Sequence, residues 1–387
     1  MELSPRVTRI QPSPSTAAAQ RVRELRAAGH EILDLTVGEP DFDTPSSVKA
    51  AAVEAIDRGE TKYTPVNGIP QLRSAISDKL LQRQKVRYPV EQITVGGGAK
   101  QVIFLALMAT LRTGDEVVVP APYWVSYPDM VLANDGIPVV VQCPASDGFK
   151  LTASALADAI TPATRWVILN APSNPTGAAY SVAELRALAD VLLDHPHVMV
   201  LTDEIYDEIW YDDTPIASLV EVEPRLVDRV FVTNGVSKTY AMTGWRIGYG
   251  AGPSELVAAI NKLQSQSSSC PSSVSQSAAV AALTGDQSFV SDAVAVYRAR
   301  RDEVVKRIND IPGLSCTSPS GGFYVFVSCG EVDDEKFCLE LLESQRVAVI
   351  HGAAYGAPGH FRVSFATSNA VLTEACERIA RACASKG

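Results

Sequence analysis

The chain has 387 residues, 46% of them hydrophobic and 20% charged, so it can bury a core that serves one large domain or two ordinary ones. Its 34 basic and 44 acidic residues leave a net charge of −10, which disfavours a general nucleic-acid-binding protein, since such a protein carries a basic footprint. No apolar run approaches the ~18 residues of a membrane-spanning helix, and residues 1–15 lack the apolar segment of a signal peptide.

The cysteines and histidines predict neither a disulfide framework nor a metal site. The seven cysteines are odd in number and no two of them have C-x-x-C spacing, and the five histidines show no metal-ligand spacing. We therefore expect reduced thiols, no metal and a cytoplasmic location.

The first predicted element is a helix that starts after the turn-forming residues 12–16 and ends at Gly29. A short strand follows within residues 31–45, broken by Gly-Glu-Pro. The middle of the chain then alternates between helical periods and short apolar runs, which predicts βαβ units and a mostly parallel sheet covered by helices on both faces. The predicted helices are 101–115 and 183–194, and the predicted strands are 116–120, 166–170, 197–203, 229–235 and 246–252.

The character of the sequence changes near residue 290. A long helical stretch leads into β-rich runs at 321–329, 346–352 and 360–367, and a last helix is predicted over 371–385. This pattern indicates a small α+β domain with its own sheet. We predict three parts, namely an N-terminal segment (1–45) that joins the small domain, a large domain (46–290) and a small C-terminal domain (291–387).

Five short segments stand where predicted strands end, which is where ligands bind in open parallel sheets. Taken singly, each has an ordinary explanation: a glycine turn, a turn asparagine, a capping aspartate, a surface lysine and a buried ion-pair arginine. The segments are GGGAK (96–100), NAPSNPTG (170–177), TDEIY (202–206), GVSKTYAMTGWRIG (235–248) and HFRVSFATS (360–368).

In this combination and order the segments resemble the fold-type I pyridoxal-phosphate aminotransferases of class I/II, in the bacterial aspartate/prephenate branch. The resemblance also covers VGEPDFDTP (37–45), APYWVSYPDM (121–130) and SKTYAMTGWRIGY (237–249). It implies an α/β large domain with a mostly parallel, seven-stranded-type sheet, a smaller α+β domain, and pyridoxal 5'-phosphate bound in the large domain.

The resemblance assigns catalytic roles to three residues. Lys238 forms the covalent bond to the cofactor aldehyde and later moves a proton, a double role that desolvation and nearby cations favour because they lower the pKa of a lysine. Asp203 pairs with the ring nitrogen, which strengthens the cofactor as an electron sink. Tyr206 hydrogen-bonds to the ring oxygen, and Asn174, a binding residue by the same resemblance, is the second donor to that oxygen.

The cofactor phosphate requires backbone amides and cations. GGGAK precedes a helical run, so the amides of Gly98, Ala99 and Lys100 are expected at a helix N-terminus, which is a natural anion site. Ser237 and Arg246 match the side-chain phosphate ligands of the family.

Two aromatic residues complete the cofactor site by resemblance. Trp124 matches the aromatic side chain that stacks on the ring. Tyr63 matches the tyrosine that reaches the phosphate of a neighbouring subunit, which implies a homodimer with shared active sites.

The substrate carboxylate calls for a planar, bidentate and always charged donor, and Arg362 matches that position. The backbone amide of Gly38 is expected to assist it. In the GAKQ context, Lys100 matches the residue that recognises a second carboxylate, with Ser15 beside it. The predicted substrate-binding set is Gly38, Arg362, Asn174, Trp124, Lys100 and Ser15.

This reading predicts a ping-pong aminotransferase acting on aspartate or glutamate with oxaloacetate or 2-oxoglutarate. Aromatic amino acids or prephenate remain alternative substrates, because the motifs do not exclude them. The cofactor chemistry also leaves open a lyase or an oxidase, and a cofactor-binding regulator without turnover is a further class. Two departures from the family, at 270–273 and 328–336, concern substrate entry and specificity.

Overall fold

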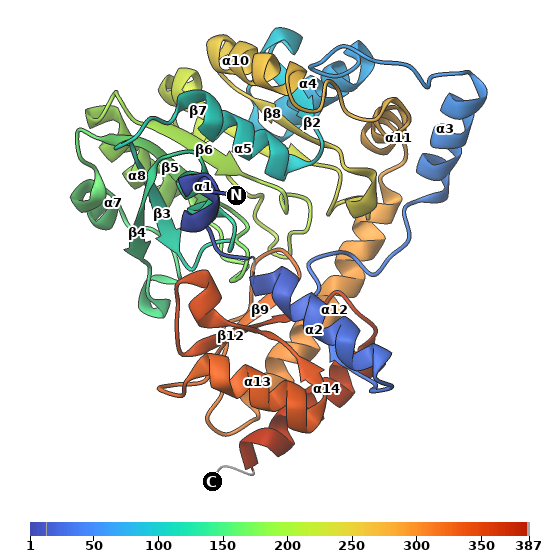
Figure 1. Cartoon of the computed structure of the whole chain (residues 1–387), viewed down its shortest axis with the longest axis vertical. Coiled ribbons are helices and arrows are strands. Elements are labelled where there is room, and N and C mark those ends of the chain that lie inside the picture. Colours follow the sequence, from blue (N-terminus) through green and yellow to red (C-terminus); the bar gives the residue numbers. More distant parts are fainter. Residues whose placement is uncertain (13, 385–387) are drawn as a thin grey trace.

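The structure, a computed structural model, describes residues 1–12 and 14–384, except for the side chains of residues 14 and 15. The elements from residue 46 to residue 284 gather around one sheet, and the C-terminal elements gather around a smaller one (Figure 1). Helix α12 (Ser288–Asn309) runs from the first group to the second.

The large sheet has seven strands in the order β2-β8-β7-β6-β5-β3-β4. Strand β8 runs antiparallel to both of its neighbours, and the other pairs within this sheet are parallel. The mostly parallel sheet expected from the alternation is therefore confirmed. The strands are β2 (Ile93–Gly96), β3 (Glu116–Ala121), β4 (Ile137–Gln142), β5 (Thr164–Asn170), β6 (Met199–Asp203), β7 (Val230–Gly235) and β8 (Gly248–Ala251).

Helices of very different length connect these strands. Helix α8 has a capping box, in which the Ser181 hydroxyl accepts from the Glu184 amide and the Glu184 carboxylate accepts from the Ser181 amide. The α-helices are α3 (Ser46–Asp57), α4 (Pro70–Gln84), α5 (Ala99–Thr110), α6 (Tyr127–Ala133), α7 (Ala153–Ala159), α8 (Val182–Asp194), α9 (Leu219–Val222), α10 (Ser254–Ser265) and α11 (Ser273–Thr284). The 3₁₀ turns are η1 (Val90–Gln92), η2 (Ala145–Asp147), η3 (Pro224–Arg229), η4 (Thr243–Trp245) and η5 (Gly352–Tyr355).

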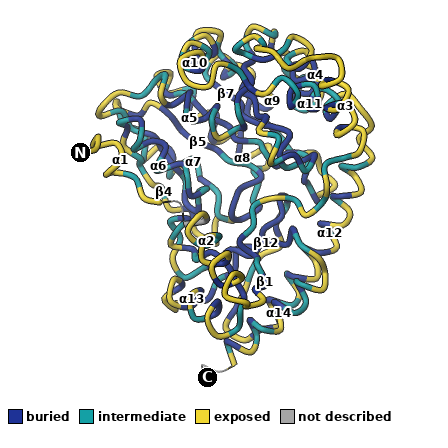
Figure 2. The backbone as a smooth tube through the Cα atoms, turned by 45° about the vertical axis from the view of Figure 1, so that its right-hand side comes forward, coloured by how far each residue is buried: buried dark blue, intermediate teal, exposed yellow. Residues whose placement is uncertain are grey.

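The two faces of the large sheet carry separate hydrophobic clusters, because successive side chains of a strand point to opposite faces. Val117, Val119 and Ile168 pack with residues of α5, α6 and α10. Val118 and Val167 pack with residues of α3, α4, α8 and α11. The strands are consequently buried, apart from the edge strand β4, while the outer turns of the helices are exposed (Figure 2).

The C-terminal group has an antiparallel three-stranded sheet in the order β11-β12-β9. Its core includes Phe323, Val325 and Phe361 and is closed by residues of the flanking helices. The elements are β9 (Tyr324–Ser328), α13 (Asp334–Gln345), β10 (Val347–Ala348), β11 (Ile350–His351), β12 (His360–Ser364) and α14 (Asn369–Ala384).

The N-terminal segment packs on the C-terminal group. Strand β1 (Leu33–Asp34) pairs in parallel with β10, and helix α2 (Pro14–Ala27) places Val22 and Leu25 against Leu342 and Ala348. A short helix, α1 (Pro5–Arg9), was not predicted from the sequence. It is held on α6 by the ion pairs of Arg6 and Arg9 with Asp135.

The division into parts at residues 45/46 and 290/291 remains a prediction, and α12 crosses the second of these boundaries. Within residues 1–12 and 14–384, none of the helices combines the length and the apolar character that crossing a membrane requires.

Candidate active site

A cavity of about 360 Å³ lies between the two groups of elements, where β5, β6 and β7 end. This is the edge at which parallel sheets bind their ligands. Every predicted site residue whose side chain is described lines it except Tyr63. The predicted residues in the lining are Gly38, Gly98, Ala99, Lys100, Trp124, Asn174, Asp203, Tyr206, Ser237, Lys238, Arg246 and Arg362.

Lys238 follows β7 and donates a hydrogen bond from Nζ to the carbonyl oxygen of Gly38. The pKa of this amine is lowered to about 8, first by burial and then by the cations Arg362 and Arg246, while Glu39 and Asp203 act in the opposite direction. A substantial fraction of the amine is therefore neutral near physiological pH, as a nucleophile and proton carrier requires.

Asp203 is the last residue of β6 and is 4% exposed. Its Oδ2 accepts a hydrogen bond of 2.6 Å from the phenol of Tyr127, and its Oδ1 accepts one of 3.3 Å from the amide of Ile205. Burial raises the pKa of Asp203 to about 6, although these hydrogen bonds and Lys238 favour the charged form. The carboxylate would be stabilised by a cation opposite it, such as a protonated ring nitrogen.

Tyr206 shares a 3.0 Å hydrogen bond with Tyr324, and both side chains are buried. Burial raises the pKa of Tyr206 well above its usual value, so this phenol stays protonated and can act as a donor. Tyr324 was missed from the sequence because it lies inside an apolar strand, β9, with no motif around it.

The cationic end of the cavity is built around Gly98. This residue is the N-cap of α5 and has φ 102°, and a Cβ at this position would collide with the guanidinium of Arg246. Arg246 donates to the carbonyl oxygens of Gly97 (3.0 Å) and Thr243 (2.9 Å). Ser237 lines the same cavity and is buried. Amides of a helix N-terminus and a fixed guanidinium together suit a phosphate.

Arg362 lies in β12 and is 3% exposed. Its two terminal nitrogens donate to Asn174 Oδ1 (3.0 Å) and to the carbonyl oxygen of Thr36 (2.6 Å). Its Nε is buried and has no hydrogen-bond partner among the described residues. A buried and incompletely satisfied cation favours an anionic ligand, because leaving it unpaired is costly.

Lys100 lies at the start of α5 with its Nζ 4.6 Å from the centre of the Trp124 ring and 3.2 Å from Ser126 Oγ. Burial, and then the charge of Arg246, lower the pKa of Lys100. Trp124 in turn packs edge-on against Tyr127. Tyr127 was also missed, because nothing in APYWVSYPDM distinguishes it from a core aromatic residue.

Tyr63 is not brought into the cavity, and the prediction for Ser15 falls outside the described side chains. Tyr63 is 90% exposed. Ser15 belongs to the first turn of α2, and its side chain lies outside the described residues.

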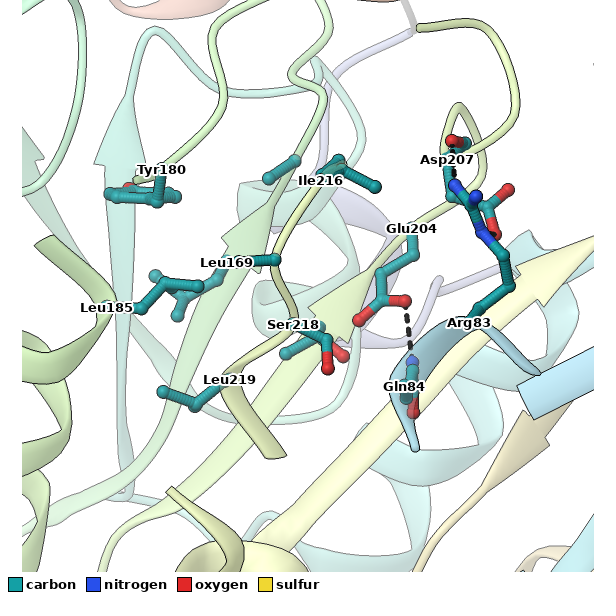
Figure 3. A pocket seen from close by; sticks show the side chains of 13 residues that line it. Arg83, Gln84, Leu169, Tyr180, Leu185, Glu204, Asp207, Ile216, Ser218 and Leu219 are labelled. Carbon is teal, nitrogen blue, oxygen red and sulfur yellow. Dashed lines mark hydrogen bonds and ion pairs between the residues drawn. The ribbon is translucent and has the colours of Figure 1, made fainter. Parts of the chain in front are cut away.

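A second cavity, of about 30 Å³, lies beyond the end of β6 and contains none of the predicted site residues. Figure 3 shows Glu204 pointing into it and joined to Gln84, with Arg83 close to Asp207. The Glu204–Gln84 hydrogen bond is 2.6 Å. Burial, and then the neighbouring charge of Asp207, raise the pKa of Glu204 to about 7.

The residues of the large cavity fit pyridoxal phosphate. An accessible amine, a carboxylate that gains from a cation, an anion cradle and a buried guanidinium converge on one space. When bound there, the cofactor supplies an electron sink for bonds at the substrate α-carbon. The fold and the site together define a pyridoxal-phosphate-dependent transferase.

Comparison with known proteins identifies the family. Residues 30–379 match the family of class I and II aminotransferases, and the chain belongs to this family, whose members use pyridoxal phosphate. It is similar to a probable aspartate/prephenate aminotransferase of Rhizobium leguminosarum bv. phaseoli, with 50% identity over 98% of each chain. It is also 50% identical to an aspartate/prephenate aminotransferase of Cereibacter sphaeroides, over 99% of this chain and 98% of the other.

Solved structures confirm the predicted fold. The aspartate aminotransferase of Rhizobium meliloti superimposes with a TM-score of 0.96 at 48% identity, covering 99% of both chains. The aspartate aminotransferase of Thermus thermophilus with maleate has a TM-score of 0.94 at 40% identity, covering 99% of this chain and all of the other.

Proposed function

We propose that this aminotransferase moves the amino group between aspartate or glutamate and the 2-oxo acids oxaloacetate and 2-oxoglutarate, by a ping-pong mechanism. The observation that carries the proposal is that two cationic side chains, Arg362 and Lys100, line the same cavity as the reactive amine of Lys238. A dicarboxylic substrate presents one carboxylate to each cation, with its α-carbon near the amine.

Arg362 receives the α-carboxylate. Its hydrogen bond to Asn174 Oδ1 turns the Asn174 amide so that Nδ2 is the group available for the cofactor's ring oxygen. Tyr206 donates to the same oxygen, and the amide of Gly38 assists Arg362. These roles follow the chemistry of each donor and acceptor.

Lys238 would hold the cofactor covalently through Nζ, and its free amine would take and return the proton at the substrate α-carbon. Asp203 keeps the ring nitrogen protonated. The amides of Gly98, Ala99 and Lys100 and the side chains of Ser237 and Arg246 hold the phosphate. Trp124 covers one face of the ring.

Lys100 receives the side-chain carboxylate of the substrate, with Ser15 as its helper. The stacking on Trp124 supports this role, since it keeps the Lys100 ammonium at the cavity. Prephenate is a second candidate acceptor, and the names of the R. leguminosarum and C. sphaeroides relatives favour it.

The protein acts as a homodimer in which Tyr63 reaches the phosphate of the neighbouring subunit. The side chain of Tyr63 is bulky, aromatic and 90% exposed, which supports a position that the partner subunit covers in the dimer. The dimer functions in the cytoplasm, in keeping with an odd number of cysteines that show no C-x-x-C spacing.

A panel of amino donors tests the proposal. Purified protein with pyridoxal phosphate is assayed with aspartate, glutamate, phenylalanine and tyrosine against oxaloacetate, 2-oxoglutarate and prephenate. We expect the highest kcat/KM for the acidic donors, and double-reciprocal plots that are parallel. A preference for aromatic donors, or release of ammonia without transfer, would refute the proposal.

A further inference from the structure

Within the described residues, the carboxylate of Asp203 accepts two hydrogen bonds, and the one from the phenol of Tyr127 is the shorter. The phenol oxygen lies 2.6 Å from Oδ2, and both residues are buried, at 2% and 4% exposure. The other hydrogen bond, from the amide of Ile205, is 3.3 Å long. The ionisable groups that face Asp203 are Tyr127, Lys238 and Tyr206.

A buried carboxylate tends to become neutral unless donors stabilise its charge. Hydrogen bonds to charged acceptors are stronger than those between neutral groups, and they are especially strong in a site shielded from water. Burial and the adjacent carboxylate both raise the pKa of Tyr127 well above its usual value. The Tyr127 hydroxyl therefore remains a donor throughout the working pH range.

Three kinds of contact fix the position of Tyr127. Trp124 packs against it edge-to-face, with 5.3 Å between ring centres and an interplanar angle of 83°. The amide of Tyr127 donates to the carbonyl oxygen of Trp124 (3.0 Å). The ring also belongs to the hydrophobic cluster beneath α5, α6 and α10.

We propose that Tyr127 is a positioning residue that keeps the Asp203 carboxylate ionised and correctly oriented for the cofactor's ring nitrogen. Tyr127 acts through Asp203 and does not take part in the chemistry. The inference rests on the assignment of Asp203 to the ring nitrogen in the proposed function.

The experiment measures cofactor binding by the apoprotein as a function of pH. Pyridoxal phosphate is titrated into wild type, Tyr127→Phe and Tyr249→Phe between pH 5 and pH 8.5. Tyr249 is the matched control, because its hydroxyl is also buried and has no partner among the described residues. Cofactor binding should weaken at low pH as Asp203 becomes protonated, so the midpoint of this transition in the dissociation constant reports the ionisation of Asp203.

In Tyr127→Phe we expect this transition to move upward by about one pH unit. The dissociation constant then rises by about ten-fold at pH 5 and by about three-fold at pH 6.5, and near pH 8.5 it approaches that of wild type. Tyr249→Phe keeps the wild-type transition. A purely structural role of Tyr127 would weaken binding equally at all pH values, and that result would overturn the inference.

A second variant tests the inference if Tyr127→Phe folds poorly. Replacing Tyr127 with 3-fluorotyrosine keeps the shape of the ring but makes the phenol a stronger donor, so the transition should move to lower pH. An unchanged or raised transition would contradict the inference.

Asp203→Asn separates this inference from the proposed function. If it removes the transition while both Tyr127 variants keep the wild-type transition, only the role of Tyr127 is wrong. If it binds cofactor and transfers amino groups like wild type, the assignment of Asp203 itself is wrong.

Discussion

Arg362 and Asn174 join the two sheets across the active site. The guanidinium Nη1 of Arg362, in β12 of the small sheet, lies 3.0 Å from Oδ1 of Asn174, which follows β5 of the large sheet. The arginine therefore reaches its place only when the C-terminal group is packed against the large sheet. The contact links the proposed site of the substrate carboxylate to the proposed site of the cofactor ring.

Arg362→Lys should reduce kcat/KM for aspartate and glutamate by about 10- to 100-fold, because a lysine cannot reproduce two charge-assisted hydrogen bonds to a carboxylate. The measurement is steady-state kinetics with both donors. Arg165→Lys, at an exposed position of β5, is the matched control and should behave like wild type. Unchanged kinetics in Arg362→Lys would mean that the α-carboxylate binds elsewhere.

Lys100→Ser should discriminate between classes of amino donor. Loss of the cation opposite the substrate side chain should lower kcat/KM by at least about ten-fold for aspartate and glutamate, and much less for phenylalanine and tyrosine. Lys262→Ser, on the exposed side of α10, controls for loss of a charge. Equal losses for acidic and aromatic donors would show that Lys100 does not read the distal carboxylate.

The rate of covalent cofactor attachment to the apoprotein should rise with pH and level off above about pH 8, since the neutral amine of Lys238 is the nucleophile and its pKa is lowered to about 8. Stopped-flow absorbance follows the reaction. Glu39 raises the pKa of Lys238, so Glu39→Gln should move the inflection to lower pH. An inflection near the ordinary lysine value would contradict the burial of this amine.

Glu204→Gln should stabilise the folded protein at pH 8 but not at pH 5. The pKa of Glu204 is raised from 4.5 to about 7 in the folded chain, so the folded state binds more protons than the unfolded state between these values. In wild type this group therefore lowers the free energy of unfolding as the pH rises from 4.5 to 7, and the loss persists above pH 7.

The stabilisation at pH 8 should be on the order of 2 kcal/mol, measured by urea unfolding of the apoprotein at both pH values. Glu91→Gln, at an exposed position, is the control. An equal effect of Glu204→Gln at pH 5 and pH 8 would show that folding does not raise the pKa of Glu204.

Much of the fold and of the site could be predicted from the sequence because the predicted site residues lie directly after apolar strands or at the start of a helix, and both kinds of element leave local sequence patterns. Asp203 ends an apolar strand, Lys238 follows the next one, and parallel pairing of β6 with β7 brings the two to one edge. Gly98 opens a helical run, so its place at a helix N-terminus could be predicted as well.

What escaped prediction depends on contacts between distant parts of the chain. Tyr127 and Asp203 are 76 residues apart in sequence, and Tyr206 and Tyr324 are 118 apart. Neither tyrosine partner, Tyr127 or Tyr324, carries a local pattern that distinguishes it from a core aromatic residue. The raised pKa of Glu204 likewise arises from burial, which its neighbours in sequence do not reveal.

The most direct test of the account locates the cofactor on the chain. The protein is saturated with pyridoxal phosphate, reduced with borohydride, digested and analysed by mass spectrometry. We expect one reduced cofactor per chain, attached to Lys238. Attachment at another lysine, or no attachment at saturation, would contradict it.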